Sequence, residues 1–232
     1  MEPFKQWFHC FIYLHPAFRM RHYPILAYIT TFSPLIPILF GILKPQPLSR
    51  QMKILVLFLI TGFLTDILSW WMILDGRLVS WPAHIYTLIE FVLVISIIYL
   101  WQESKKVRRL FQGIISFYIV FWGYSKLTFE PLNGLDSITS SISRVILILC
   151  AGYTLFVVIG NNLQSLLNNQ RFWVSLSFVL FFIGTLMSFA LQGILYSHSR
   201  EYLYLAWSIN WVLAIFCNIL FAIGFLCPQT QP

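Results

Sequence analysis

The stretch AHIYTLIEFVLVISIIYLW, residues 83–101, is apolar over almost its whole length and contains a single acidic residue, Glu90. A helix rises about 1.5 Å per residue, so a run of about 20 apolar residues crosses the hydrocarbon core of a bilayer. The stretch therefore predicts a membrane-spanning helix. A carboxyl group inside such a helix is unfavourable unless it faces other protein or a polar space. Glu90 thus indicates a bundle of helices with a polar interior.

The composition of the whole chain is that of a membrane protein. Of the 232 residues, 59% are hydrophobic and 10% are charged, far from the balance of soluble domains. The net charge of +7 could indicate a nucleic-acid partner, but the basic residues lie in short connections between apolar runs, as in cytoplasmic loops of membrane proteins. We therefore expect no nucleic acid. The four scattered cysteines show neither zinc-site spacing nor a disulfide framework.

Seven apolar runs have about the length of a spanning helix. They cover residues 23–43, 52–74, 83–101, 110–126, 138–159, 172–196 and 202–226, and the fourth is the shortest and most polar. In lipid the backbone must satisfy its own hydrogen bonds, which favours helices. The expected fold class is an all-α integral membrane protein, a seven-transmembrane-helix bundle.

The two ends of the chain differ from this bundle, which covers residues 23–226. Residues 1–22 hold an aromatic-rich run that is too short to span but suits the headgroup region. This pattern predicts a short interfacial N-terminal helix that is retained rather than cleaved. Residues 227–232 form a short C-terminal tail.

The basic residues predict the orientation in the membrane. Loops after the first, third and fifth runs contain one acid, Glu103, against Lys44, Arg50, Lys53, Lys105, Lys106, Arg108, Arg109 and Arg171. Short loops rich in lysine and arginine stay in the cytoplasm. We therefore expect the N-terminus outside and the C-terminus in the cytoplasm, in a bacterial inner membrane.

Polar side chains inside the apolar runs are the candidate ligand-binding residues. They are Asp66, His84, Tyr86, Glu90, Arg144, Ser188, Gln192, Trp207 and Asn210. Because consecutive helices run in opposite directions, all of them fall in the outer half of the bundle, which predicts a polar and aromatic cavity that opens outward. The plainer interpretation is that such side chains bond helix to helix, at about 0.6 kcal/mol each.

Several chemistries are not expected from this sequence. The last apolar run has no lysine to hold retinal. A catalytic metal needs several converging histidines, and of the five in the chain only His84 could lie near Asp66 and Glu90. No Ser-His-Asp spacing or phosphate-binding glycine loop is visible. We therefore expect no metal and no cofactor, and the catalytic residues of any enzyme stay unassigned.

Four stretches together give the chain a resemblance to a known group of proteins. They are TDILSWW (65–71), HIYTLIEF (84–91), RFWVSLSFVLFFIGTLM (171–187) and WSINWVLAIFCNILFAIGFL (207–226). In their order and character they resemble an uncharacterised bacterial family of small seven-helix integral membrane proteins. Some members of that family occur beside sensor histidine kinases, so the resemblance implies such a kinase as a signalling partner. It implies no catalytic residues.

These observations lead to one functional expectation and two alternatives. We expect a receptor-like membrane protein that binds a small-molecule or lipid-like ligand, is surrounded by membrane lipids, and signals through a partner. A lipid-modifying hydrolase could instead use Asp66 and Glu90 as acid and base. A proton-coupled transporter would also use acids at this depth. The sequence sets no oligomeric state.

Overall fold

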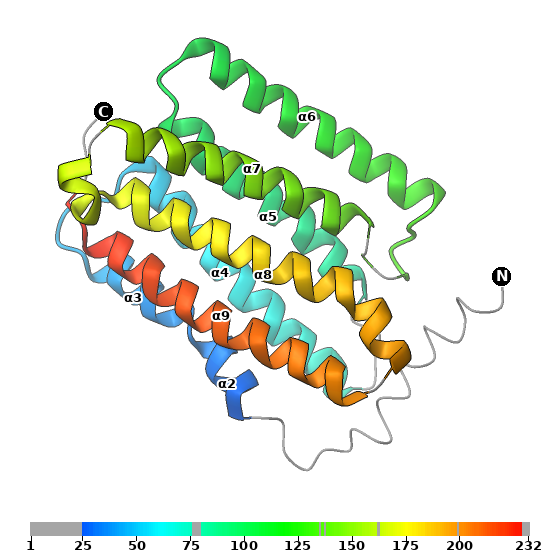
Figure 1. The fold of residues 1–232 in the computed structure, drawn as a ribbon. Coiled ribbons are helices and arrows are strands. Elements are labelled where there is room, and N and C mark those ends of the chain that lie inside the picture. Colours follow the sequence, from blue (N-terminus) through cyan, green and yellow to red (C-terminus); the bar gives the residue numbers. More distant parts are fainter. Residues whose placement is uncertain are drawn as a thin grey trace.

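The computed structural model describes residues 25–75, 80–134, 136, 138–161, 163–198 and 200–228, and these ranges contain helices and no strands. The elements are α2 (Ile25–Phe32), α3 (Leu35–Leu43), α4 (Arg50–Leu74), α5 (Ser80–Trp101), α6 (Lys105–Thr128), α7 (Ile138–Asn161), the 3-10 helix η1 (Leu163–Asn168), α8 (Gln170–His198) and α9 (Arg200–Leu226) (Figure 1). The predicted all-α fold class is confirmed. Six of the seven predicted apolar runs each lie in one α-helix and the first comprises two, α2 and α3. The predicted N-terminal segment 1–22 and residues 229–232 of the predicted tail 227–232 lie outside the described residues.

The first predicted helix is not continuous. α2 ends at Phe32, and Ser33 and Pro34 separate it from α3. Proline has no amide hydrogen to donate to the carbonyl group four residues earlier, which is that of Thr30. The Ser33 hydroxyl donates to this same carbonyl oxygen over 2.7 Å. The predicted span over 23–43 is therefore interrupted at the Ser33–Pro34 step, although Ile25–Leu43 as a whole is long and apolar enough to cross a membrane.

Six helical stretches are long and apolar enough to cross a membrane. They are Ile25–Leu43, Arg50–Met72, Ser80–Trp101, Ile138–Gly160, Gln170–Met187 and Ser208–Leu226. These stretches indicate an integral membrane protein. α6 has 24 residues, yet it is not among the six found in the described residues, because basic and polar side chains interrupt its apolar run.

The helices are arranged as a closed ring with one helix outside it. Going around the ring, α3 packs on α4, α4 on α5, α5 on α7, α7 on α8, α8 on α9, and α9 again on α3. α6 lies along the outside of this ring and packs mainly on α5 (Figure 1). The side chains that α5 and α7 bury are therefore enclosed by neighbours on several sides.

Aromatic side chains join three helices of the ring. The rings of Phe58 on α4 and Phe178 on α8 have their centroids 5.6 Å apart, and Phe221 on α9 lies 5.2 Å from Phe178. All three side chains are at most 4% exposed. Edge-to-face pairs of this kind add about 0.5–1.5 kcal/mol each beyond their buried area.

The buried side chains of α5 and α7 change from polar to apolar along each helix. Near the helix starts they are His84, Thr87, Glu90, Thr139, Ser140, Ser143 and Arg144. Further along they are mainly Val94, Ile95, Ile97, Ile98, Leu147, Cys150 and Ala151. The polar interior therefore lies toward the end of the ring where α5 and α7 begin.

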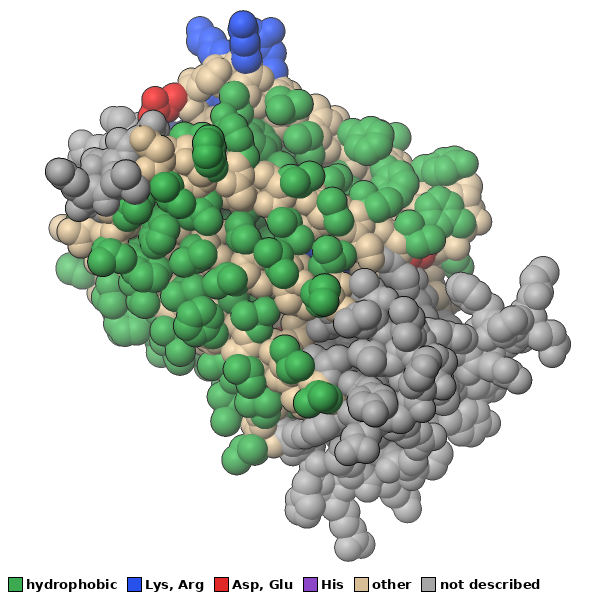
Figure 2. Space-filling view, viewed as in Figure 1, with side chains coloured by type: hydrophobic (Ala, Val, Ile, Leu, Met, Phe, Trp, Pro, Cys, Tyr) green, Lys and Arg blue, Asp and Glu red, His purple; other side chains and the backbone are tan. Residues whose placement is uncertain are grey.

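The outer surface is largely apolar. Figure 2 shows hydrophobic side chains covering much of the visible face, with Lys and Arg gathered at one end. Large side chains such as Leu149 and Phe156 on α7 are exposed by 67% and 75%. Such a surface would be unfavourable in water and suits contact with lipid chains.

Candidate functional site

Glu90 provides an enclosed carboxyl group inside the ring. It lies on α5 and is 1% exposed. The Tyr86 hydroxyl, one helical turn earlier, hydrogen-bonds to this carboxyl group. Among the described residues, Oε2 of Glu90 has no hydrogen-bond partner. Since buried polar atoms are almost always paired in native proteins, this oxygen needs an explanation.

Tyr86 brings α5 and α4 together. A Cβ on Gly62 of α4 would lie 3.0 Å from the Tyr86 hydroxyl oxygen, so the hydroxyl rests against the α4 backbone where glycine leaves space. Asp66, one turn further along α4, acts on Tyr86 electrostatically, as Glu90 does. The carboxyl groups of Asp66 and Glu90 therefore both act on one side chain, that of Tyr86.

Arg144 supplies positive charge from α7. Its side chain is 7% exposed, and Nη1 donates a hydrogen bond of 3.0 Å to the Ser140 carbonyl oxygen. Its charge also acts on Glu90 and Tyr86. Tyr86, Glu90 and Arg144 thus form one group of buried polar side chains, which we call the interior group.

Asp66 does not share the enclosure of Glu90. Asp66 is exposed on the surface of α4, whereas Glu90 is buried. The nearby Thr65 hydroxyl bonds to the Thr61 carbonyl oxygen of its own helix over 2.8 Å. This stripe of α4 therefore satisfies its own polar groups rather than lining the ring.

The remaining predicted site residues belong to α8 and α9. Asn210 is half-buried on α9. Ser188 and Gln192 belong to α8 and Trp207 to α9, but their side chains lie outside the described residues. Whether these residues line a cavity with Glu90 stays a prediction.

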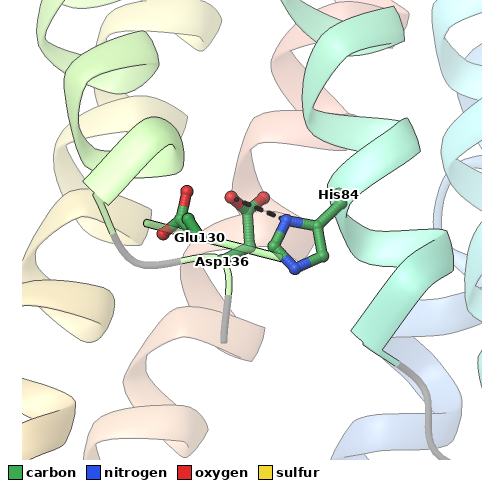
Figure 3. A group of neighbouring side chains, drawn as sticks. All are labelled: His84, Glu130 and Asp136. Carbon is green, nitrogen blue, oxygen red and sulfur yellow. Dashed lines mark ion pairs between the residues drawn. The ribbon is translucent and has the colours of Figure 1, made fainter. Parts of the chain in front are cut away.

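His84 belongs to a second group at the end of the ring where α5 and α7 begin. The Lys126 ammonium of α6 lies 2.6 Å from His84 Nδ1, 3.0 Å from Glu130 Oε2 and 3.3 Å from Asp136 Oδ1. It also donates to the Thr139 hydroxyl over 2.9 Å. Figure 3 shows the histidine and the two carboxylates turned toward one another. We call His84, Lys126, Glu130, Asp136 and Thr139 the end cluster.

Backbone contacts fix the end cluster to its helices. Oε1 of Glu130 accepts from the Ile138 amide over 2.8 Å, which caps the start of α7. The Thr139 hydroxyl contacts both carboxylates. His84 Nε2 lies 3.1 Å from the Gly134 carbonyl oxygen. Because a carbonyl oxygen can only accept, Nε2 carries a hydrogen, and Nδ1 is the ring nitrogen that faces Lys126 and Asp136.

These contacts keep both acids of the end cluster ionised. Burial alone would raise the pKa of Asp136, but contacts with His84, Thr139 and Thr87 and the Lys126 charge outweigh it and hold the pKa well below its ordinary value. At Glu130, burial likewise raises the pKa, whereas hydrogen bonds from Thr139, Lys126 and the Ile138 amide lower it. The net effect is a lowered pKa. The cluster therefore holds two negative charges around one ammonium group.

The end cluster also has the donor types of a metal site. His84, Glu130 and Asp136 offer ligand atoms that all lie within 4.8 Å of one another. They come from α5, the α6–α7 connection and the residues just before α7. From the sequence, His84 was the histidine that could lie near Asp66 and Glu90.

Most of the end cluster was not predicted from the sequence. Lys126, Glu130 and Asp136 look like ordinary charges at a membrane surface, and Thr139 looks like a helix start. One signal was available, since Lys126 and Glu130 are four residues apart, a spacing that pairs charges along a helix. The partners from α5 follow only from the ring arrangement.

Comparison of the chain found no matching family model, no matching curated protein and no matching solved structure. The function is therefore argued from the interior group and the end cluster alone.

Proposed function

We propose that this chain is a receptor-like membrane protein that binds a small or lipid-like ligand at the interior group. The observation that carries the proposal is the buried Oε2 of Glu90, which has no hydrogen-bond partner among the described residues. A buried acceptor without a partner costs about 1–3 kcal/mol. A bound molecule that donates a hydrogen bond there would remove this cost.

The interior group defines the chemistry of the ligand. Glu90 Oε2 accepts, so the ligand must present a hydroxyl or amine hydrogen. The Arg144 guanidinium, which acts on Glu90, can bind an oxygen of the same head group. Past Glu90, α5 buries only apolar side chains up to Trp101. A ligand with a polar head and an apolar body fits these surroundings.

The direction of access follows from where the polar side chains lie. On α5 and α7, most buried polar residues lie toward the helix starts, whereas the basic side chains Lys105, Lys106 and Arg108 lie at the start of α6, next to the end of α5. Cytoplasmic ends are rich in lysine and arginine. The ligand therefore approaches from the outer side of the membrane, with the N-terminus outside.

α6 completes the bundle as a seventh span in this proposal. Large apolar side chains on α6 point away from the ring, and Phe117, Val120 and Leu127 are exposed by 64%, 72% and 89%. Tyr118 holds the opposite face, since its ring stacks on Phe91 of α5 and its hydroxyl donates to the Thr139 carbonyl oxygen. Such a helix suits a position between the ring and lipid.

A partner would receive the signal at the basic end. Lys105, Lys106, Arg108 and Arg109 are exposed there and offer a contact for an acidic surface. A sensor histidine kinase is the partner that the family resemblance implies. Movement of α5 or α7 on ligand binding would reach this end along the helices.

The two alternatives receive less support. A hydrolase that uses Asp66 and Glu90 as acid and base needs both at one substrate atom. Asp66 is exposed, Glu90 is buried, and each acts on Tyr86 rather than on the other. For proton-coupled transport, no described contact gives Glu90 a proton path to both sides.

Native mass spectrometry with lipid analysis tests the proposal on the full chain purified in mild detergent. We expect a discrete bound molecule in the wild type and its loss from Glu90→Gln, in which an amide replaces the acceptor. Glu103→Gln is the matched control, because Glu103 is an exposed acid outside the ring. Equal retention by wild type and Glu90→Gln, or no bound molecule in either, would contradict ligand binding at Glu90.

A further inference from the structure

We propose that the end cluster is a binding site for a divalent transition ion of the Zn²⁺ class, with Lys126 as a built-in competitor. The ligands are His84 Nδ1, Asp136 Oδ1 and Glu130 Oε2. This site is separate from the interior group, and the inference does not depend on the proposed ligand binding.

Each ligand is held by its other polar atom. His84 Nε2 bonds to the Gly134 carbonyl oxygen, so Nδ1 is the ring nitrogen turned toward Asp136 and Lys126. Asp136 Oδ2 accepts from the Thr87 hydroxyl over 2.6 Å, and Glu130 Oε1 accepts from the Ile138 amide. Supporting contacts of this kind orient the ligands in protein metal sites and fix the histidine tautomer.

The spacing of the donor atoms is compatible with metal coordination. Zinc bonds to nitrogen and oxygen are about 2.0–2.2 Å long, so two ligands at a tetrahedral angle lie about 3.4 Å apart. His84 Nδ1 and Asp136 Oδ1 are 3.3 Å apart. The Glu130 donor lies within 4.8 Å of both, so a small side-chain movement closes the set.

Lys126 shows that a cation is stable at the point where these atoms meet. Its ammonium group contacts all three donors. The carboxylates of Glu130 and Asp136 both face this one ammonium group. A divalent ion would balance both carboxylates. Lys126 belongs to α6, the helix outside the ring, and its long side chain would have to swing outward for an ion to take its place.

The ligand types favour a transition ion over calcium or magnesium. Calcium and magnesium take oxygen ligands almost exclusively, whereas an imidazole nitrogen suits Zn²⁺ and its neighbours in the first transition row. One histidine and two carboxylates also leave a coordination position open, which the Thr139 hydroxyl or water can fill. Zn²⁺ is therefore the ion to test first, with Co²⁺ as its spectroscopic substitute.

The test measures Zn²⁺ binding to the metal-stripped full chain by equilibrium dialysis and elemental analysis. In Lys126→Met the competing charge is gone, and we expect one Zn²⁺ per chain at least about tenfold tighter than in the wild type, which corresponds to 1.4 kcal/mol. Adding Asp136→Asn to Lys126→Met should weaken binding at least about tenfold. Co²⁺ in Lys126→Met should give the strong visible absorption of a tetrahedral site. Glu103→Gln in that background is the control that leaves it unchanged, because Glu103 is exposed at the other end of α6.

Two results would overturn the metal site. Lys126→Met that binds Zn²⁺ no better than the wild type would mean that the end cluster is an ion network completed by the lysine. Binding that survives Asp136→Asn would place the ion elsewhere. If Lys126→Met does not fold, Zn²⁺ binding is compared between the wild type and His84→Asn, both of which keep Lys126. Zn²⁺ must bind more weakly to His84→Asn.

Discussion

The Tyr86 hydroxyl of α5 rests on Gly62 of α4, at 3.0 Å from the position of a Cβ there. The contact matters because the same hydroxyl hydrogen-bonds to Glu90. A glycine on one helix thus determines where a tyrosine on the next helix can hold the buried carboxyl group. Close approach over a small residue is a common packing device in membrane helices.

Gly62→Ala should weaken ligand retention without unfolding the ring. The new methyl group would push the hydroxyl away by a few tenths of an ångström and lengthen its bond to Glu90, whereas alanine itself favours a helix by about 1 kcal/mol over glycine. Native mass spectrometry should show less bound molecule at an unchanged melting temperature. Gly152→Ala on α7 is the control, because a Cβ there meets no atom within 4 Å. Equal ligand loss in both variants would contradict the role of Tyr86.

Acid should destabilise the protein through Glu130 and Asp136. Their folded pKa values are lowered, while unfolded carboxyl groups take up protons near pH 4. The stabilisation is therefore complete above about pH 4 to 5 and is lost as the pH falls below about 4. Melting temperatures measured with EDTA from pH 7 to pH 3 should fall steeply for the wild type and less steeply for Asp136→Asn. Parallel curves would show that Asp136 does not contribute.

The sequence predicted the helices well and the polar groups only in part. The apolar runs can be read from the order of the residues, and the carboxyl group of Glu90 inside one of them indicated a polar interior of the bundle. The break at Pro34 required the chain to use Ser33 as a substitute donor, which no hydropathy pattern reports. The exposure of Asp66 and the pairing of His84 with Asp136 depend on which helices are neighbours, and a single sequence does not contain that information.

Lys44 should stabilise the junction of α3 and α9. Its ammonium donates to the carbonyl oxygens of Phe225 and Cys227 over 2.7 Å and 2.8 Å, so it caps the end of α9 from the end of α3. Hydrogen bonds from charged groups contribute about 1.5–3 kcal/mol each. Lys44→Met should therefore lower the melting temperature clearly, whereas Lys53→Met, which changes an exposed lysine of α4, should not. Equal melting temperatures for the two variants would mean that water replaces the cap.

The course of α6 decides whether the bundle has seven spans. Glu103 precedes α6 and Leu132 follows it, and both side chains are exposed. If α6 crosses the membrane in the proposed orientation, an impermeant maleimide should label Leu132→Cys in intact cells and Glu103→Cys only after the membrane is opened. The wild type gives the background from its own thiols, of which Cys150, Cys217 and Cys227 are buried. Labelling of both variants from the same side would show that α6 lies along the surface, and the reverse pattern would invert the orientation and place the end cluster in the cytoplasm.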